Sequence, residues 1–325
     1  ARTWRQQSAS ARQLAVIDVD GTLAGTTGEC REQMAMAYEG TWGYHPLMVS
    51  LANTQEVLAV VNRPGNNTSN ANAARWMDYG VHWAREEAGF DEVLLRGDTA
   101  YALTTNFDRW TKDDVRFVFG IMAHSQFQIQ AEALAEESWT AFDRNKDSDS
   151  GRRRQTNVRQ REVENKGLKE LVLEAEHIAE WDYTPHRARG TYRMIALRKT
   201  IKVVKGQARL EDEVRYFFYI TNDWAIDAED VVFEANDRCD QENLIAQLAG
   251  GVRALSAPVD NLMSNWAYMV MTALAWNLKA WWALWLPEQR RWREKHQSEK
   301  HLVLRMEFRT FLNAFIKIPC QIVRG

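Results

Sequence analysis

The order of strands and helices in the first 120 residues constrains the fold of this chain more than any other feature. Short apolar runs bounded by turn residues predict five strands. These strands are expected at residues 14–20, 46–51, 56–62, 91–96 and 114–120. The pattern also predicts a helix from Ser69 to about Ala88 and another between the last two strands. Three strands, a helix, a strand, a helix and a strand are the order of a ribonuclease-H-like fold, so we expect an α/β core of that type.

Beyond this region, strand-like and helical patterns lie on both sides of a strongly charged stretch. The expected elements are a helix at 128–142, a charged loop or exposed helix at 144–166, strands at 191–204 and 214–221, and a helical pattern from Ala225. Gly250 and Gly251 are expected to end that pattern. The remainder is helical and rich in tryptophan.

The composition is typical of a globular protein, and the use of cysteine indicates a reducing compartment. The chain has 325 residues, of which 45% are hydrophobic and 26% charged, so it can bury a large core. Cys30, Cys239 and Cys320 are far apart and lack Cys-x-x-Cys spacing, which fits a reducing cytoplasm and argues against a zinc site. The chain begins at Ala1 and shows no signal-peptide pattern there. We therefore expect a cytoplasmic protein.

The segment Trp266 to Leu286 is apolar enough to raise the question of a membrane span. About 20 apolar residues can cross a bilayer. However, Asn277 and Lys279 stand in its middle, and a lysine inside a membrane is costly. We expect a helix that belongs to a core or to a dimer contact, and no membrane association.

Basic residues gather in two stretches, although the formal net charge is only −3. The first stretch, 152–169, begins with Arg152, Arg153 and Arg154, and the second spans 187–205. Local basic surface can bind a polyanion, but a run of charges is also commonly a solvated face. Charge alone leaves both interpretations open.

Two aspartates end the first predicted strand. Asp18 and Asp20 are two residues apart, so their side chains share one face of the strand. With Gly21 and Thr22 they resemble the first motif of haloacid-dehalogenase-type phosphatases, where the first Asp is the nucleophile and the second the acid/base. That family also uses a later pair such as Gly-Asp-x-x-x-Asp. A glycine and an aspartate at 97–98 begin such a pair, but alanine stands at position 102.

A second interpretation takes three acids from separate elements. Either Asp18 or Asp20 would act with Asp98, after the fourth strand, and Glu242, on a late helix. Two divalent cations need carboxylates from different elements to activate a water and stabilise the leaving oxygen at phosphorus. Mg²⁺ keeps several waters, so three acids suffice. A single Asp at a strand end more often caps a turn or helix, but three acids in this order favour a metal site.

Six stretches extend these observations over nearly the whole chain. They are Ile17 to Thr22, Tyr38 to Leu47, Asn62 to Asn66, Leu95 to Thr99, Asp237 to Ile245 and Leu304 to Leu312. Together they resemble bacterial insertion-sequence transposases with an Asp-Asp-Glu catalytic core. The resemblance implies a ribonuclease-H-like core with a β-rich insertion before the Glu-bearing helix. The implied domains are the first part of the core (1–125), a basic insertion that is helical and then β-rich (126–222), the Glu-bearing helix (223–250) and a helical Trp-rich region (251–325).

The resemblance also implies a reaction and its partners. Such an enzyme hydrolyses the phosphodiester bond at the ends of its element and then uses the freed 3′-hydroxyl to attack target DNA. It implies two Mg²⁺ ions, for which Mn²⁺ can substitute, held by Asp18, Asp98 and Glu242, with Asp20 nearly as suitable as Asp18. Double-stranded DNA would be the substrate, a homodimer would assemble on it, and the enzyme would be nucleoid-associated.

Relatives carry a Tyr-x2-Arg-x3-Glu-x6-Lys signature around the third acid. Arg238 and Glu242 match it and lie four residues apart on one helical face. The Tyr and Lys positions are Ala235 and Ala249, and in the family these two side chains are thought to hold phosphates. The departures imply weak cleavage, substitution by Arg253 or another base, or a domesticated descendant that binds DNA without cutting it.

Further phosphate contacts are expected outside the acids. The candidates are Arg238, Arg63, Asn66, Arg152, Arg153, Arg154 and Arg253. Arg63 and Asn66 follow the third strand, where they could approach DNA or form a turn held by Pro64 and Gly65.

Overall fold

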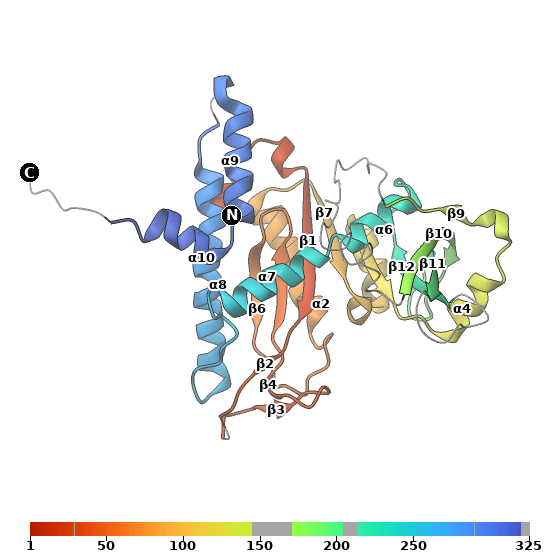
Figure 1. The fold of residues 1–325 in the computed structure, drawn as a ribbon, viewed down its shortest axis with the longest axis horizontal. Coiled ribbons are helices and arrows are strands. Elements are labelled where there is room, and N and C mark those ends of the chain that lie inside the picture. Colours follow the sequence, from red (N-terminus) through yellow and green to blue (C-terminus); the bar gives the residue numbers. More distant parts are fainter. Residues whose placement is uncertain (29, 145–170, 204–212, 289, 320–325) are drawn as a thin grey trace, which may run out of the picture. The chain divides into compact units, whose positions relative to one another are not determined.

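The structure is a computed structural model that describes residues 1–28, 30–144, 171–203, 213–288 and 290–319 (Figure 1). The chain forms two compact units. The first combines Ala1–Arg96 with Arg238–Gly325, and the second is Gly97–Asp237. Both contain strands and helices, so the chain is a mixed α/β protein.

The first unit is built on a sheet with strand order β6-β5-β1-β7. Its strands are β1 (Leu14–Gly21), β5 (Leu47–Leu51), β6 (Glu56–Val61) and β7 (Glu92–Gly97). β5 runs antiparallel to both β1 and β6. The register places Asp18 opposite Ser50 and Asp20 opposite Met48. The two aspartates therefore share one face of the sheet with Ser50 and Met48.

The opposite face carries Ile17 and Val49 and is covered by helix α2 (Ala73–His82). Gly80 makes this close packing possible. A Cβ atom at Gly80 would lie 3.2 Å from Cγ1 of Val49 and 3.3 Å from Cγ2 of Ile17. The helix continues as a π-helical segment, Trp83–Ala88, which leads to β7.

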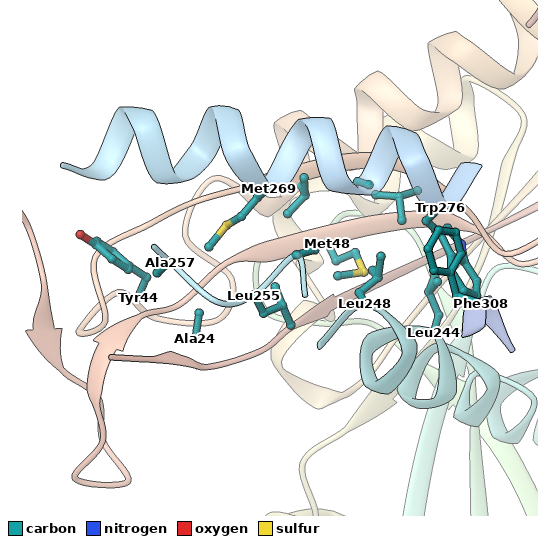
Figure 2. Packing of buried hydrophobic residues seen from close by; sticks show 14 of the residues in the cluster. Ala24, Tyr44, Met48, Leu244, Leu248, Leu255, Ala257, Met269, Trp276 and Phe308 are labelled. Carbon is teal, nitrogen blue, oxygen red and sulfur yellow. The ribbon is translucent and has the colours of Figure 1, made fainter. Parts of the chain in front are cut away.

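The face that carries the aspartates is covered mainly by helices from the end of the chain. These are α7 (Cys239–Gly250) and α8 (Leu262–Trp285). Leu248 of α7 and Met269 and Trp276 of α8 belong to one buried cluster with Met48 of β5 (Figure 2). This cluster thus joins the sheet to segments more than 150 residues away in sequence.

Helix α8 lies along β6, the edge strand of this part of the sheet. The Asn277 amide takes the place of a neighbouring strand: its Oδ1 accepts from the Val57 N–H at 2.8 Å and its Nδ2 donates to the Val57 carbonyl at 2.8 Å. The indole N–H groups of Trp266 and Trp276 donate to the carbonyls of Val60 and Gln55. Backbone groups that an edge strand would expose are satisfied in this way.

Shorter elements complete the first unit. A small sheet with order β2-β4-β3 consists of β2 (Ala24–Gly25), β4 (Trp42–Tyr44) and β3 (Ala35–Met36). Helix α1 (Arg2–Arg5) precedes β1, and helices α9 (Arg293–Arg305) and α10 (Phe308–Phe311) follow α8.

The second unit contains a sheet with strand order β8-β12-β11-β10-β9. Its strands are β8 (Val115–Ile121), β9 (Thr140–Ala141), β10 (Leu171–Tyr183), β11 (Tyr192–Val203) and β12 (Glu213–Thr221). Its helices are α3 (Phe107–Lys112), α4 (Ser125–Glu132) and α6 (Ala228–Asn236). Phe107, Phe117, Phe119 and Tyr192 pack as buried aromatic rings in its core.

Most of the predicted elements are confirmed, with differences that have physical reasons. All five early strands are present, and the later strands correspond to β11 and β12. The strand β10 was not predicted, and the expected helix at 128–142 is the shorter α4. The helical pattern from Ala225 is two helices, broken at residues 237–238. The pairing of β8 with β12 places the fifth early strand in the second unit.

Helix α8 is only partly the buried helix that its sequence suggested. One side packs in the core and carries Lys279, whereas the other side is exposed. None of the helices within the described residues has both the length and the apolar character to cross a membrane.

Candidate active site at the end of strand β1

Asp18 is buried at the centre of the first unit. It is 1% exposed, and the Arg96 guanidinium from β7 donates to both of its oxygens, Nε to Oδ1 at 2.7 Å and Nη2 to Oδ2 at 2.9 Å. Arg96 is itself buried. A two-pronged pair of this kind fixes the position of both side chains. It also occupies both carboxylate oxygens of Asp18.

Asp20, two residues further along β1, has a more open environment. Its side chain is 17% exposed, and its Oδ2 accepts from Arg238 Nη1 at 3.1 Å. Its Oδ1 accepts from the backbone N–H of Gly21 at 2.8 Å. The strand therefore presents two aspartates on one face that differ sharply in access to solvent.

The electrostatics of Asp18 reflect its burial. Desolvation raises the pKa of its carboxyl group above the ordinary value, while the Arg96 guanidinium acts in the opposite direction. Arg238 favours the charged form, and Asp240 disfavours it. Asp18, Arg96, Arg238 and Asp240 thus form one electrostatic group within the first unit, next to Asp20.

Glu242 lies in the first turn of α7 with its side chain exposed. Gln241, Leu244 and Leu248 form the buried side of this helix. Nε2 of Gln241 donates to Oγ of Ser50 at 3.3 Å, and Ser50 stands opposite Asp18 in the sheet. This bond ties the first turn of α7, and with it Glu242, to the face of the sheet that carries the aspartates.

The signature residues are divided by the start of α7. Arg238 directly precedes the helix and reaches Asp20. Ala235 lies on α6, and Ala249 is exposed near the C-terminal end of α7. Neither alanine can supply the phosphate-binding group that the family signature has there.

Asp98 directly follows β7 and belongs to the second unit. It is half-buried, and its Oδ1 accepts from the Ala100 N–H at 2.8 Å. In this position it caps the short 3-10 helix Thr99–Tyr101. The second oxygen, Oδ2, takes no part in this cap.

The expected phosphate contacts fall into three groups. Arg63 is 4% exposed and donates to the backbone carbonyls of His45, Ser69 and Ala71. It therefore organises its own loop, in keeping with the turn that the sequence left open as one of two interpretations. Asn66 and Arg253 are exposed. Arg152, Arg153 and Arg154 lie outside the described residues.

The donor chemistry of the candidate acids fits a hard divalent cation. Asp20, Asp98 and Glu242 offer carboxylate oxygens, which Mg²⁺ and Mn²⁺ prefer. Asp20 and Glu242 are accessible to solvent. In the part of the chain that the structure describes, three or more His, Cys, Asp or Glu side chains do not come together as a ready-made metal site.

Sequence reasoning did not assign a role to Arg96, Ser50, Gln241 or Asp240. Arg96 did give a signal, because an arginine inside an otherwise apolar strand needs a buried acidic partner. Ser50 and Gln241 gave none, because their pairing depends on sheet register and on how α7 is seated.

The chain is similar to one family of known proteins. Residues 2–306 match the family described as transposase DDE domain group 1. No curated protein matches the chain. Among solved structures, the piggyBac transposase synaptic complex with hairpin DNA is similar with a TM-score of 0.46 and 10% sequence identity. The match covers 94% of this chain, which spans 55% of the length of that one.

Proposed function

Because this chain belongs to the group 1 family of transposase DDE domains, we propose that it cuts DNA at the ends of a mobile element and joins the freed 3′-hydroxyl to target DNA. The match over residues 2–306 is the observation that carries this proposal. The contact between Arg238 and Asp20 supports it, because it joins the helix-borne signature to the aspartates of the first strand.

Asp20, rather than Asp18, is the first catalytic acid in this proposal. A ligand to metal must expose an oxygen to the cation and to DNA. Both oxygens of Asp18 are bound by Arg96 in the interior, whereas Asp20 is partly exposed. Asp18 then holds the strand end in place through Arg96 and is a positioning residue.

Asp98 and Glu242 complete the set of acids. Glu242 is exposed on a helix that Gln241 fastens to the sheet. Asp98 has a carboxylate oxygen, Oδ2, outside the cap that Oδ1 forms. Asp20, Asp98 and Glu242 would hold the divalent metal, in keeping with the two ions and the Mg²⁺ or Mn²⁺ expected from sequence. When bound, such ions activate water and stabilise charge at phosphorus.

Arg238 has two roles in the proposed cycle. Without DNA it neutralises Asp20 through its Nη1. If Asp20 held a metal ion, the Arg238 guanidinium could instead bind a DNA phosphate, for which its planar fork is well suited. Double-stranded DNA is the proposed partner, with Asn66 and Arg253 as exposed candidates for backbone contacts. Assembly as a homodimer on DNA remains part of this proposal.

The first alternative, a domesticated descendant that binds DNA, differs from the proposed transposase only in that it does not cut DNA. Ala235 and Ala249 replace the two further phosphate-binding residues of the signature, so a protein that binds DNA without cutting it shares every other feature. The phosphatase alternative has less support, because its nucleophile would be Asp18, which is buried and bound through both oxygens.

Nicking of supercoiled plasmid in Mg²⁺ and in Mn²⁺ tests the proposal. We expect metal-dependent nicking by the wild type and a loss of at least about 100-fold in Asp20→Asn, Asp98→Asn and Glu242→Gln, because each removes a metal ligand. The matched control is Glu294→Gln, since Glu294 is also an exposed acid in the first turn of a helix of the first unit.

Three outcomes would count against the proposal. Nicking that is equal in all variants would come from a contaminating nuclease or another site. DNA binding without nicking in either metal would favour the domesticated descendant. Hydrolysis of a phosphate ester that depends on Asp18 but not on Asp20 would favour the phosphatase.

A further inference from the structure

Helix α8 has an exposed side that is entirely uncharged over its 24 residues. Seven large apolar side chains on this side are between 46% and 69% exposed. They are Met263, Val270, Met271, Leu274, Leu278, Trp282 and Trp285. The one charged residue of the helix, Lys279, is buried on the other side. We call these seven residues the α8 stripe.

The stripe faces away from the core cluster but borders the core side of the helix, since Val270 and Leu274 line a pocket with Asn277, and Trp282 contacts Phe315. Met269 and Trp276 point from α8 toward the sheet (Figure 2). The stripe residues recur every three or four positions, which keeps them on one side of an α-helix from its first turn to its last. The exposed residues between them, Ser264 and Ala267, are small and uncharged.

The area of the stripe exceeds what an isolated protein surface usually carries. Its exposed fractions add up to about four complete large apolar side chains, which is roughly 600–800 Å². The largest apolar patch on a typical monomer is about 300–600 Å². A stable protein–protein interface buries about 800 Å² on each partner. The stripe therefore has the size of one half of an interface.

The spacing of the stripe is nearly symmetric about Leu274. Met263 and Trp285 lie eleven residues before and after it, and Val270 and Leu278 lie four before and after. If two copies of α8 pack antiparallel with Leu274 at the two-fold axis, each of these residues meets its counterpart. The small Ala267 would then face Trp281, and Trp282 would face Trp266. An isologous dimer interface requires such a self-complementary surface.

We propose that the α8 stripe is a homodimer interface in which two α8 helices pack antiparallel around Leu274. A second copy fits better than a nucleic acid, since the stripe has no basic side chain to contact phosphates. A second copy also fits better than a charged partner surface, because the stripe has no charged side chain to pair with it. The inference does not depend on the proposed reaction, because this dimer forms without DNA.

The test is the mass of the full chain in solution without DNA, measured by light scattering or sedimentation over a range of concentrations. We expect the wild type to dimerise and Leu274→Glu to raise the dissociation constant at least about tenfold, because two carboxylates would meet at the axis. Ile129→Glu is the control. Ile129 is also an exposed apolar residue on a helix, but it lies on α4 in the second unit.

A crosslink tests the symmetry directly. With the native cysteines replaced by serine, Leu274→Cys should form a disulfide-linked dimer on oxidation, since a residue on the two-fold axis meets itself. Ile129→Cys should not. A wild type that remains monomeric at all concentrations would overturn the inference, as would equal dimerisation of wild type and Leu274→Glu. Because nicking is assayed separately, its loss or retention leaves this result unaffected.

Discussion

Asp18 and Asp20 differ by two positions on one strand face, yet the structure predicts opposite effects when each is replaced by asparagine. Asp18→Asn replaces one of the two oxygens that bind the buried Arg96 guanidinium with an amide N–H₂ group, so that two donors face each other. Removing one member of a buried ion pair costs about 3–5 kcal/mol of unfolding free energy. Asp20→Asn affects a pair whose members are 17% and 18% exposed, so we expect a cost of about 1 kcal/mol or less.

Denaturant unfolding and plasmid nicking, measured on the same two variants, separate the roles. We expect Asp18→Asn to lose several kcal/mol of unfolding free energy. Under conditions in which this variant is still folded, we expect it to nick plasmid. Asp20→Asn should keep its stability and lose nicking. Similar stability losses in both variants would refute the reasoning from burial. Full nicking by Asp20→Asn would refute its assignment as a metal ligand.

The pH dependence gives the same pair an independent test. Burial raises the folded-state pKa of Asp18, so its protonation favours the folded state. Its contribution to stability is present below the unfolded pKa and is lost as pH rises through the folded pKa. In Arg96→Met the opposing guanidinium is absent and that pKa rises further. We therefore expect the stability deficit of Arg96→Met to be smaller at pH 5 than at pH 8.

Three further predictions concern the packing of the first unit. Asn277→Leu should cost about 2–3 kcal/mol in denaturant unfolding, because the Val57 N–H and carbonyl both lose their partner. Burial lowers the pKa of Lys279 from 10.5 to about 8. The unfolding free energy of the wild type, measured relative to Lys279→Met, should therefore rise by about 2 kcal/mol between pH 7 and 9.5. A difference that stays constant over this range would contradict the prediction. Gly80→Val should lower the thermal midpoint by several degrees, because its side chain would meet atoms that lie only 3.2–3.3 Å from a Cβ.

The early part of the fold could be predicted from the sequence because its signals are local. The strands β1, β5, β6, β7 and β8 are apolar runs bounded by turn residues, and all five lie within a few residues of their expected positions. The strand β10 could not be found in this way. Its sequence, LVLEAEHIAEWDY, is rich in Leu, Glu and Ala, which favour helices. Pairing with β11 along nearly its whole length overrides that preference.

The tryptophans of α8 show a similar limit. Periodicity predicted a helix, but an apolar sequence on all sides does not show which side faces the core. The edge strand β6 decides this, because Trp266, Trp276 and Asn277 bind its backbone. The α8 stripe is exposed only as a consequence of that choice.

The two aspartates of β1 illustrate why chemistry is harder to predict than a fold. Alternation placed both on one face, and no local signal ranked them. The ranking comes from Arg96, which lies 78 residues beyond Asp18, and from Arg238, 218 residues beyond Asp20. Arg96 is buried and removes Asp18 from solvent, whereas Arg238 sits at the start of a helix and leaves Asp20 partly open. The strand that carries the acids is local in sequence, but the partner that each acid finds is a property of the folded sheet.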